Sequence, residues 1–421
     1  MHKNKILIIG SGISGLSAAN LLKDRSFITV LEKSNLTGGL IRCEKIDGHL
    51  YHKVGGHIFN SKIPKVLDWF WSYFNKDNEF LKTTRNAKIL WQNKIIGYPV
   101  EDYVYQMGEQ EVKDIIRDWV NLSSTEKRDP FSYKNFESFL KGQFGETLYQ
   151  LYFKPYNQKI WQTDLSNIPM EWLEGKLPMP ELISMFQHNF LHQEESEMVH
   201  STFFYPREGG SQFIINRLSE GINIQLNSEV SSMVFDKDHW IVNGEPFNNI
   251  IYTGDVRKIP GNLNITLPRS LISSLEKLQS NGTSNMLCET DPTDISWLYI
   301  PSPQLRAHRI IYTGNFSQNN NKAGGRISCT VEFSGKTSEA EMLEEINKLP
   351  GNLKPIAWNY EPNSYVIQSK DTRKTISDLK AILKPYRFHL LGRFAEWEYY
   401  NMDKCIEAAM KLADQLKFLN Q

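Results

Sequence analysis

The stretch KILIIGSGISGLSAANLL, residues 5–22, decides the fold of the N-terminal part of the chain. It begins with a short apolar run bounded by glycine, which is the pattern of a strand buried on both faces, and it continues with a helical period. FITVLEK, residues 27–33, has the pattern of a second buried strand. A strand, a helix and a strand in this order predict a βαβ unit and therefore a parallel sheet.

Gly10, Gly12 and Gly15 lie between the first strand and the helix with the spacing G-x-G-x-x-G. The first glycine allows the tight turn, the second lets the backbone approach a pyrophosphate, and the third allows close packing of helix and strand. The free N–H groups of the helix N-terminus favour the phosphates. Glu32 ends the second strand, where a carboxylate accepts a hydrogen bond from a ribose hydroxyl. The spacing predicts a dinucleotide site; the alternative is a glycine turn without a ligand.

A second pair of glycines follows the acid in NLTGGLIRC, residues 35–43. Gly38 and Gly39 would allow another close approach of the backbone to a ligand, as expected when FAD rather than NAD occupies the site. An ordinary loop is the alternative interpretation.

The composition excludes several classes of protein. Lys plus Arg and Asp plus Glu number 48 each, so no overall field attracts nucleic acid or an anionic membrane. The 4 Cys are far apart and form no CxxC pair, which argues against a disulfide framework and a zinc site. No apolar run approaches the roughly 20 residues that span a bilayer, and the first residues enter a strand without a signal-peptide pattern. We expect a cytoplasmic protein without a metal, a nucleic-acid partner or membrane insertion.

At 421 residues the chain is long enough for two or three domains. The period is mostly helical over 101–195, whereas AKILWQNKIIGYPV predicts a hairpin with its turn at Gln92 and Asn93. Residues 221–254 alternate with period two, which predicts a β-meander that ends in a further sheet strand. The predicted class is α/β, with a Rossmann-like FAD-binding domain, an inserted helical domain and an antiparallel β-sheet domain. Their expected ranges are 1–75, 205–260 and 375–421 for the FAD-binding domain, 101–200 for the helical substrate or lid domain, and 76–100 and 261–374 for the antiparallel sheet.

LYFKPYNQKIW, residues 151–161, places four aromatic rings close together and separates them with Lys154 and Lys159. Rings at helical spacing are commonly a packing seam of large residues. The same stretch could form a pocket that stacks a flat ring beside an anionic group. Composition and period leave both interpretations open.

Four segments occur in one order: VGGHIFNS (54–61), YFKPYNQKIW (152–161), WLYIP (297–301) with HRIIYTGNFS (308–317), and GRFAEWEYYNMD (392–403). This series resembles the UDP-galactopyranose mutases along nearly the whole chain. The resemblance implies a flavin-dependent mutase that interconverts the pyranose and furanose forms of a UDP-sugar for cell-surface glycan precursors. In that family reduced FAD acts through N5 as the nucleophile on the anomeric carbon.

The resemblance also implies roles for particular residues. To the glycines and Glu32 it adds cofactor contacts from Lys33, Leu40, Gly56, His57, Gly392, Arg393 and Met402. It implies catalytic roles for His57, Arg309 and Lys176. The implied substrate contacts are Tyr98, Phe153, Tyr156, Asn157, Trp161, Lys176, His200, Tyr299, Arg309, Tyr365 and Tyr399. Tyr156 would stack on uracil and Arg309 would bridge the diphosphate. A flavin reductant such as NAD(P)H and a homodimer are expected.

The chain departs from the family pattern at Lys176, Phe316, Asn401 and His200. Lys176 replaces an arginine, so that a two-pronged contact becomes a point charge. Phe316 lacks the hydroxyl of a tyrosine. All four positions are expected near the sugar or the diphosphate, so the sugar could differ from galactose. Two alternatives remain: an FAD-dependent oxidoreductase of the amine oxidase and protoporphyrinogen oxidase class, and a catalytically silent flavoprotein that binds nucleotide sugars.

Overall fold

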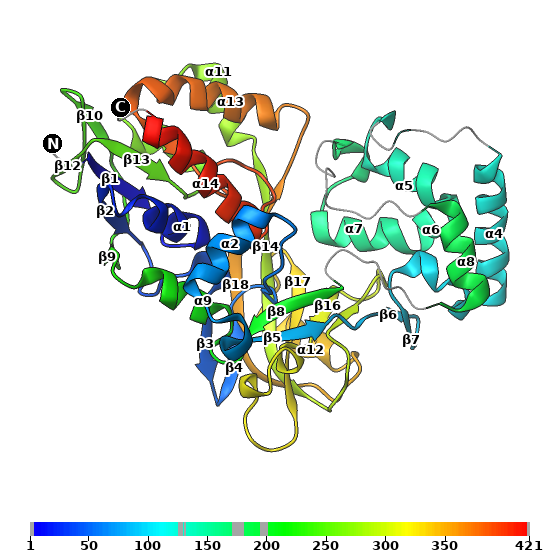
Figure 1. The fold of residues 1–421 in the computed structure, drawn as a ribbon. Helices are drawn as coiled ribbons and strands as arrows, with labels where there is room; N and C mark the ends of the chain where they lie inside the picture. Colours follow the sequence, from blue (N-terminus) through cyan, green and yellow to red (C-terminus); the bar gives the residue numbers. More distant parts are fainter. Residues whose placement is uncertain (1–3, 125–128, 130–131, 171–180, 194–200, 419–421) are drawn as a thin grey trace.

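The structure is a computed structural model that describes residues 4–124, 129, 132–170, 181–193 and 201–418. The chain forms an α/β body, a second body around a large, mostly antiparallel sheet, and a helical body (Figure 1). Both termini lie at the α/β body, on the side away from the helical body. The predicted fold class is confirmed.

The α/β body is built on a five-stranded sheet of order β19-β13-β1-β2-β9, in which all neighbours are parallel. Its strands are β1 (Asn4–Ile9), β2 (Ser26–Leu31), β9 (Asn223–Gln225), β13 (Asn249–Tyr252) and β19 (Phe388–Leu390). Ile8 of the central strand pairs with Val30 of β2 and Ile251 of β13. The βαβ start and the return of the chain to the sheet near its C-terminus follow the prediction.

Successive side chains of strand β1 point to opposite faces of the sheet. Helices cover both faces, and strand β1 is therefore buried on both sides. The helices that cover the sheet are α1 (Ile13–Leu22), α11 (Arg269–Glu276), α13 (Thr372–Leu383) and α14 (Met402–Phe418). Ile6 and Ile8 pack with α1 and α14, whereas Leu7 packs with α11 and α13. Helix α11 therefore packs on the α/β body, although the boundary predicted at residue 260 assigns it to the antiparallel sheet. An amphipathic helix does not reveal by its period which body it covers.

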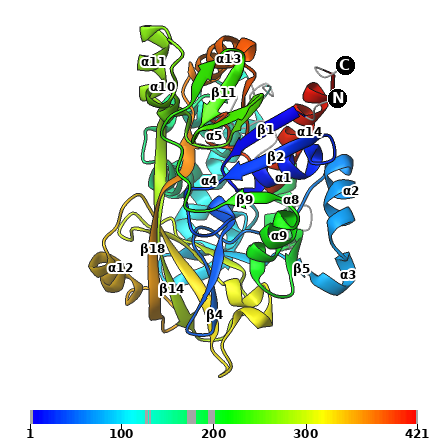
Figure 2. The ribbon, with the colours of Figure 1, turned by 90° about the vertical axis from the view of Figure 1, so that its left-hand side faces the viewer.

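The second body is a seven-stranded sheet of order β18-β14-β17-β16-β15-β6-β7. Its strands are β6 (Ala87–Trp91), β7 (Lys94–Gly97), β14 (Gln279–Thr290), β15 (Trp297–Tyr299), β16 (Ala307–Ile311), β17 (Ile327–Ser334) and β18 (Lys354–Ile367). All neighbours are antiparallel except β15 and β6. The hairpin turn at Gln92 and Asn93 is confirmed. The long strands β14 and β18 extend from this sheet toward the α/β body (Figure 2).

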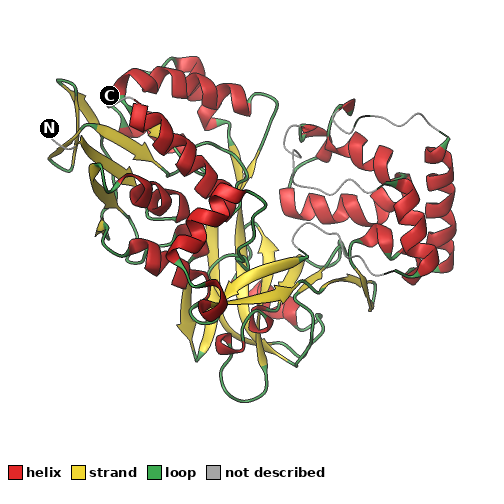
Figure 3. Cartoon of the chain, in the orientation of Figure 1, coloured by secondary structure: helices red, strands yellow, loops and turns green. Residues whose placement is uncertain are grey.

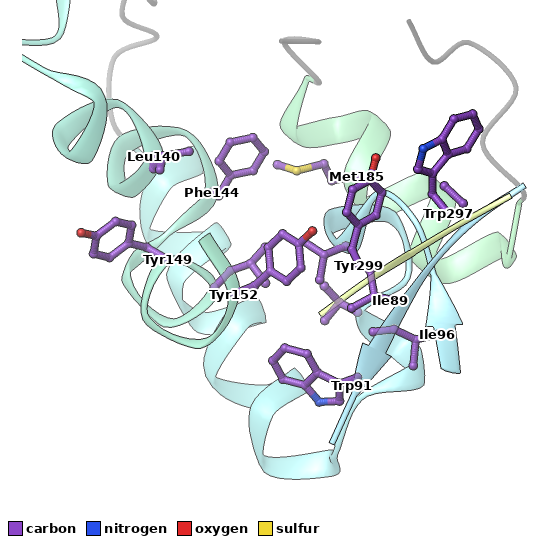
Figure 4. Packing of buried hydrophobic residues seen from close by; sticks show 14 of the residues in the cluster. Ile89, Trp91, Ile96, Leu140, Phe144, Tyr149, Tyr152, Met185, Trp297 and Tyr299 are labelled. Carbon is purple, nitrogen blue, oxygen red and sulfur yellow. The ribbon is translucent and has the colours of Figure 1, made fainter. Parts of the chain in front are cut away.

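The helical body consists of segments that follow β7 in the chain, and its described regular structure is helical (Figure 3). They are α4 (Glu109–Ser123), α5 (Phe136–Phe144), α6 (Glu146–Leu148), the π-helical turn η5 (Tyr149–Phe153), α7 (Lys154–Trp161) and α8 (Leu182–Leu191). Helix side chains such as Phe144 and Tyr152 join sheet side chains such as Ile89 and Tyr299 in one core cluster (Figure 4). This cluster fixes the helices against one face of the seven-stranded sheet.

Smaller elements connect the three bodies. The strands are β3 (Cys43–Ile46), β4 (His49–His52), β5 (Phe80–Thr84), β8 (Thr202–Pro206), β10 (Val234–Asp236), β11 (His239–Val242) and β12 (Glu245–Phe247). The helices are α2 (Pro64–Tyr73), α3 (Lys76–Glu79), α9 (Gly210–Ser219), α10 (Ile259–Asn262) and α12 (Glu339–Ile346). Strands β10, β11 and β12 form the predicted meander. Within the described ranges, no helix combines the length and apolar character needed to cross a bilayer.

Candidate functional site

The loop between β1 and α1 has the geometry of a dinucleotide-binding turn. Gly10 has φ +105°, and a Cβ on Gly15 would lie 2.1 Å from the Gly10 carbonyl oxygen. These two positions therefore require glycine for the turn and for helix–strand packing. Gly12 is the N-cap of α1 and makes no side-chain cap hydrogen bond. The N–H groups of the first turn are thus directed toward a ligand position.

Glu32 lies immediately after β2, next to this loop. One carboxylate oxygen accepts hydrogen bonds from the Ser11 backbone N–H at 2.9 Å and the Ser11 hydroxyl at 2.8 Å. The other accepts from the Ser34 N–H at 2.9 Å. These bonds fix a buried carboxylate beside the glycine turn, and the oxygen that accepts only from Ser34 keeps a lone pair for a ribose hydroxyl. Lys33 points to solvent as an exposed residue.

The second glycine pair lies directly against the first loop. Gly12 and Gly38 form a parallel β-bridge. A Cβ added to Gly12 would have the Gly39 Cα, at 3.9 Å, as its nearest protein atom. The backbone at Gly12 thus leaves room that a Cβ would fill, in ordinary van der Waals contact with the Gly38–Gly39 backbone. The residues fit a dinucleotide whose pyrophosphate lies against this backbone, as FAD would.

The C-terminal segment reaches the same end of β1. Gly392 has φ +92°, and a Cβ there would lie 2.5 Å from the Ser14 hydroxyl in the first turn of α1. Met402 begins α14 and packs with Ile13 and Ile41. Leu40 lies beside Ile41 in a short 3₁₀ turn. Gly392, Leu40 and Met402 are therefore brought to the dinucleotide loop, as the resemblance implies.

The loop that leads to His57 rests on a row of residues that crosses the seven-stranded sheet. The row follows the strand register and consists of Tyr299, Arg309, Glu332, Asn285 and Asn359. The side-chain amides of Asn285 and Asn359 each donate to the Lys53 carbonyl at 2.8 Å. Glu332 accepts from the Gly55 N–H at 2.7 Å. Three hydrogen bonds from one row thus hold the backbone just before His57.

His57 is neutral at physiological pH. Burial lowers the pKa of His57 to about 4, and the positive charges of Arg393 and Arg309 act in the same direction. Its Nε2 is buried and has no hydrogen-bond partner among the residues that the structure describes. A buried polar atom without a partner is rare in a native protein and is expected to meet a ligand or water. This nitrogen fits a polar group of a bound cofactor or substrate.

Glu332 connects the His57 loop to the predicted diphosphate arginine. Arg309 donates through Nε to Glu332 and through Nη2 to the Tyr365 hydroxyl at 3.2 Å. Burial alone would raise the pKa of Glu332, but the Arg309 charge holds that pKa well below its usual range. Sequence analysis missed Glu332. The signal was one carboxylate inside the apolar strand pattern RISCTVEFSG, residues 326–335.

His52, at the end of β4, allows a prediction about acid stability. Its Nε2 lies 2.7 Å from the Tyr205 hydroxyl, and burial lowers the pKa of His52 to about 3. Unfolding returns the imidazole to its ordinary pKa of 6.5, so only the unfolded chain binds this proton between pH 6.5 and 3. This histidine therefore removes about 1.4 kcal/mol of stability for each pH unit below 6.5.

His52→Asn is expected to shrink the difference in urea unfolding free energy between pH 7.5 and pH 5 by about 2 kcal/mol. His239→Asn, at an exposed residue of the meander, serves as the control. An equal pH difference in the wild type and the His52 variant would contradict the prediction.

Two tyrosines, a tryptophan and an arginine meet near the end of β18. Tyr365 and Tyr399 stack with ring centroids 5.8 Å apart, and Trp161 meets Tyr365 edge-on at 5.9 Å. The Arg393 guanidinium lies 4.6 Å from the centre of the Tyr399 ring and donates to the Ser364 carbonyl at 2.9 Å. Residues predicted to bind cofactor and residues predicted to bind substrate are thus adjacent here.

In the aromatic stretch 151–161 some side chains are buried in the core and others are partly exposed. Tyr152 and Trp161 are buried, whereas Phe153, Tyr156 and Asn157 are half-buried. Phe153 belongs to the π-helical turn η5, whereas Tyr156 and Asn157 belong to α7. The Asn157 side-chain amide donates back to the Phe153 carbonyl at 2.8 Å. This bond orders Asn157 and leaves its oxygen available as an acceptor.

Tyr299 joins the helical and sheet sides of the candidate site. Its ring stacks on Tyr98 at 4.7 Å and meets Tyr156 edge-on at 5.6 Å. The Tyr299 hydroxyl accepts a hydrogen bond from Arg85 Nη2 at 2.5 Å. Sequence analysis missed Arg85, because a single arginine before the strand of residues 87–91 has no distinguishing pattern.

Lys159 of the aromatic stretch does not form the cationic half of a ligand pocket. The Lys159 ammonium donates to the carbonyls of Ile300, Ser302 and Ala307 at 2.7, 2.8 and 3.0 Å. Burial lowers the pKa of Lys159 to about 7, against an opposing effect of Glu345. Lys159 therefore fastens α7 to the β15–β16 connection, and its cation serves the fold.

The structure describes two of the four residues that depart from the family pattern. Phe316 is only 1% exposed and packs on Trp297 with ring centroids 4.8 Å apart. A Cβ on Gly56 would meet the Phe316 ring at 3.1 Å. Phe316 thus supports the His57 loop from behind as a buried packing residue. Asn401 is an exposed residue just before α14. Lys176 and His200 lie outside the described residues.

Residues 8–74 match the NAD(P)-binding Rossmann-like domain family. The chain is 22% identical to a UDP-galactopyranose mutase of Mycoplasma genitalium over 98% of this chain and 94% of that protein. It is 25% identical to a dTDP-fucopyranose mutase of Escherichia coli over 60% of this chain and 63% of that protein.

Among solved structures, a reduced UDP-galactopyranose mutase superposes with a TM-score of 0.87 at 20% identity, covering 100% of this chain and 95% of that one. A putrescine oxidase superposes with a TM-score of 0.66 at 14% identity, covering 98% of each chain. The fold is thus shared by solved proteins whose names give different activities, a mutase and an oxidase. The two curated mutases and the larger TM-score confirm the resemblance to the UDP-galactopyranose mutase family that the four sequence segments indicate.

Proposed function

We propose that the protein is a flavin-dependent mutase that interconverts the pyranose and furanose forms of a UDP-sugar, UDP-galactose or a close relative, for cell-surface glycan precursors. Reduced FAD, when bound, supplies the nucleophile for the anomeric carbon. The observation that carries the proposal is the arrangement around Arg309. Its guanidinium is oriented by Glu332 and lies beside the Tyr365 hydroxyl, next to the rings of Tyr156 and Tyr299.

In this proposal the chain binds the nucleotide and retains it. Arg309 and the hydroxyls of Tyr299, Tyr365 and Tyr399 bind the diphosphate, since charge-assisted hydrogen bonds to phosphate are strong. Tyr156 supports the uracil ring. Together these groups hold UDP after it leaves the sugar, so that it can return to the same carbon.

The same residues control the space around the sugar. Trp161 and the stacked pair Tyr365 and Tyr399 form an aromatic wall that excludes water. His57, neutral and held by the Gly55–Glu332 bond, presents its loop to the cofactor. Gly12 and Arg393 contact the cofactor from the dinucleotide loop and from the C-terminal segment.

Two other functions remain as alternatives. An oxidoreductase of the amine oxidase class would use an apolar channel, whereas this site brings guanidinium and tyrosine hydroxyl groups together. A silent flavoprotein would bind UDP and not turn over. The polar character of the site favours the mutase over the oxidoreductase, and turnover alone separates the mutase from the silent protein.

The test is to reduce the flavin-loaded protein with dithionite, add UDP-galactopyranose, and analyse the products by chromatography. A new furanose peak is the expected result. dTDP-fucopyranose in a parallel reaction tests the second nucleotide sugar. No product from either compound, with UDP bound tightly, would identify a silent protein; rapid oxygen use with a small amine would identify an oxidase. NAD(P)H in place of dithionite tests the reductant.

Tyr156→Ala is expected to weaken UDP binding by about 1–3 kcal/mol, because it removes a base-stacking ring. Tyr156→Phe is the matched control, since it keeps the ring and should keep most of the affinity. Isothermal titration of the flavin-loaded proteins measures both. Equal affinity of the alanine variant and the wild type would show that uracil does not lie on Tyr156.

A further inference from the structure

We infer that Arg85 supplies a second guanidinium for the diphosphate of the nucleotide sugar, opposite Arg309 across the Tyr299 ring. This inference rests on the proposed function and deepens it. It assigns a binding role to a residue that neither the sequence motifs nor the resemblance indicates.

Arg85 is a half-buried cation that has no carboxylate partner among the described residues. Its Nη2 donates to the Tyr299 hydroxyl, and its guanidinium lies 5.4 Å from the centre of the Tyr98 ring and 5.2 Å from that of Trp297. Its Nε is buried and finds no hydrogen-bond partner in the part of the chain that the structure describes. The charge of a second cation, Arg309, also acts on it. Aromatic faces and one hydroxyl compensate only part of the cost of burying such a charge.

The strand register places the two arginines on either side of one tyrosine. Tyr299 of β15 and Arg309 of β16 are direct cross-strand partners, so their side chains leave the same face of the sheet. Arg85 reaches the tip of the Tyr299 ring from the segment before β6. Tyr299 thus lies between two guanidinium groups.

The charged groups around Tyr299 carry an excess of positive charge, which favours the binding of an anion. Glu332 is engaged with Arg309, and the Arg393 guanidinium donates to the carbonyls of Ser364 and Tyr400. Two guanidinium groups, Arg85 and Arg393, therefore remain without a carboxylate partner among the described residues. A diphosphate would neutralise Arg85 and Arg309 together, and a guanidinium matches phosphate oxygens through paired N–H groups.

The experiment compares the affinities of UDP and uridine for the flavin-loaded protein by titration calorimetry. Arg85→Met is expected to weaken UDP binding by about 10- to 100-fold and to leave uridine binding unchanged, because only UDP carries the phosphates. The slope of UDP affinity against salt should fall in the same variant. Arg217→Met is the matched control, since Arg217 also lies over two aromatic rings, at 5.6 and 5.3 Å, but is paired with Glu79 at 2.7 Å.

The outcomes separate the inference from the proposed function. If Arg85→Met weakens the binding of UDP and of uridine equally, Arg85 only orders the tyrosines. If the variant binds UDP as tightly as the wild type, the inference is also overturned. If wild-type protein itself binds UDP no better than uridine, the proposed function fails first. If Arg85→Met loses its flavin, Arg85→Lys takes its place, because lysine keeps the charge and loses the paired N–H groups. A selective loss of UDP affinity in this variant supports the inference. Unchanged affinities for UDP and uridine contradict it.

Discussion

Arg309→Ala is expected to lower the kcat/KM of the reduced enzyme for its UDP-sugar by about 30- to 4,000-fold. Truncating one member of a hydrogen-bonded, buried charge pair costs about 2–5 kcal/mol, and each 1.4 kcal/mol corresponds to tenfold. The loss should appear in UDP affinity as well, because Arg309 and the Tyr365 hydroxyl face the same ligand position. Initial rates by chromatography and UDP titrations provide the measurements.

The alanine variant also leaves Glu332 buried without its main counter-charge, which destabilises the fold. The double variant Arg309→Ala, Glu332→Gln removes that unpaired charge. It should regain thermal stability relative to the single variant and remain as inactive. Recovery of activity in the double variant would mean that Arg309 serves only to neutralise Glu332. Arg309→Lys should be intermediate, since lysine keeps the charge and loses the paired N–H groups.

Gly12→Ala is expected to weaken FAD binding by about 1–3 kcal/mol and Gly12→Val to abolish it, because overfilling a packed space has costs of this size. The backbone at Gly12 has φ −73° and ψ 179°, which any residue adopts, and no protein atom lies within 3.9 Å of the added Cβ. The variant should therefore fold as apoprotein. The new methyl group would occupy the space at the cofactor pyrophosphate.

FAD content of the purified protein and fluorescence titration of the apoprotein measure this effect, and circular dichroism confirms that the fold is kept. Gly261→Ala in α10 is the matched control, since no atom lies within 4 Å of its added Cβ. Gly15→Ala is the contrasting variant, because its Cβ would clash with the Gly10 carbonyl and damage the fold itself. Full FAD occupancy in Gly12→Ala would place the cofactor away from this loop.

The dinucleotide loop could be predicted from sequence because its parts are close along the chain. Gly10, Gly12 and Gly15 act through a turn of six residues, and Glu32 follows on the next strand. Buried strands and turn glycines carry their own local signals. The same holds for the hairpin at Gln92 and for the meander of β10–β12, which the structure confirms.

In the aromatic stretch 151–161, local sequence signals predict the helix but not the role of each side chain. Its period predicts a helix, and α7 is present, but the period alone does not distinguish the packing rings from the half-buried ones. It also suggests that Lys159 serves an anion, whereas three backbone carbonyls bind this ammonium. The period also does not show that the Phe316 ring packs against Gly56 and Trp297. In each case the neighbour that decides the role lies far away in the sequence.

The sequence by itself determined the Rossmann-like start, the α/β class and the resemblance to the mutase family, since these depend on residues that act with near neighbours in the chain. Only the tertiary structure brought Glu332 to Gly55, 277 residues apart, and Arg85 to Tyr299, 214 residues apart. The physical reason is strand register. A charged side chain in a strand is satisfied by whichever residue folding places beside it, and no local pattern specifies that partner.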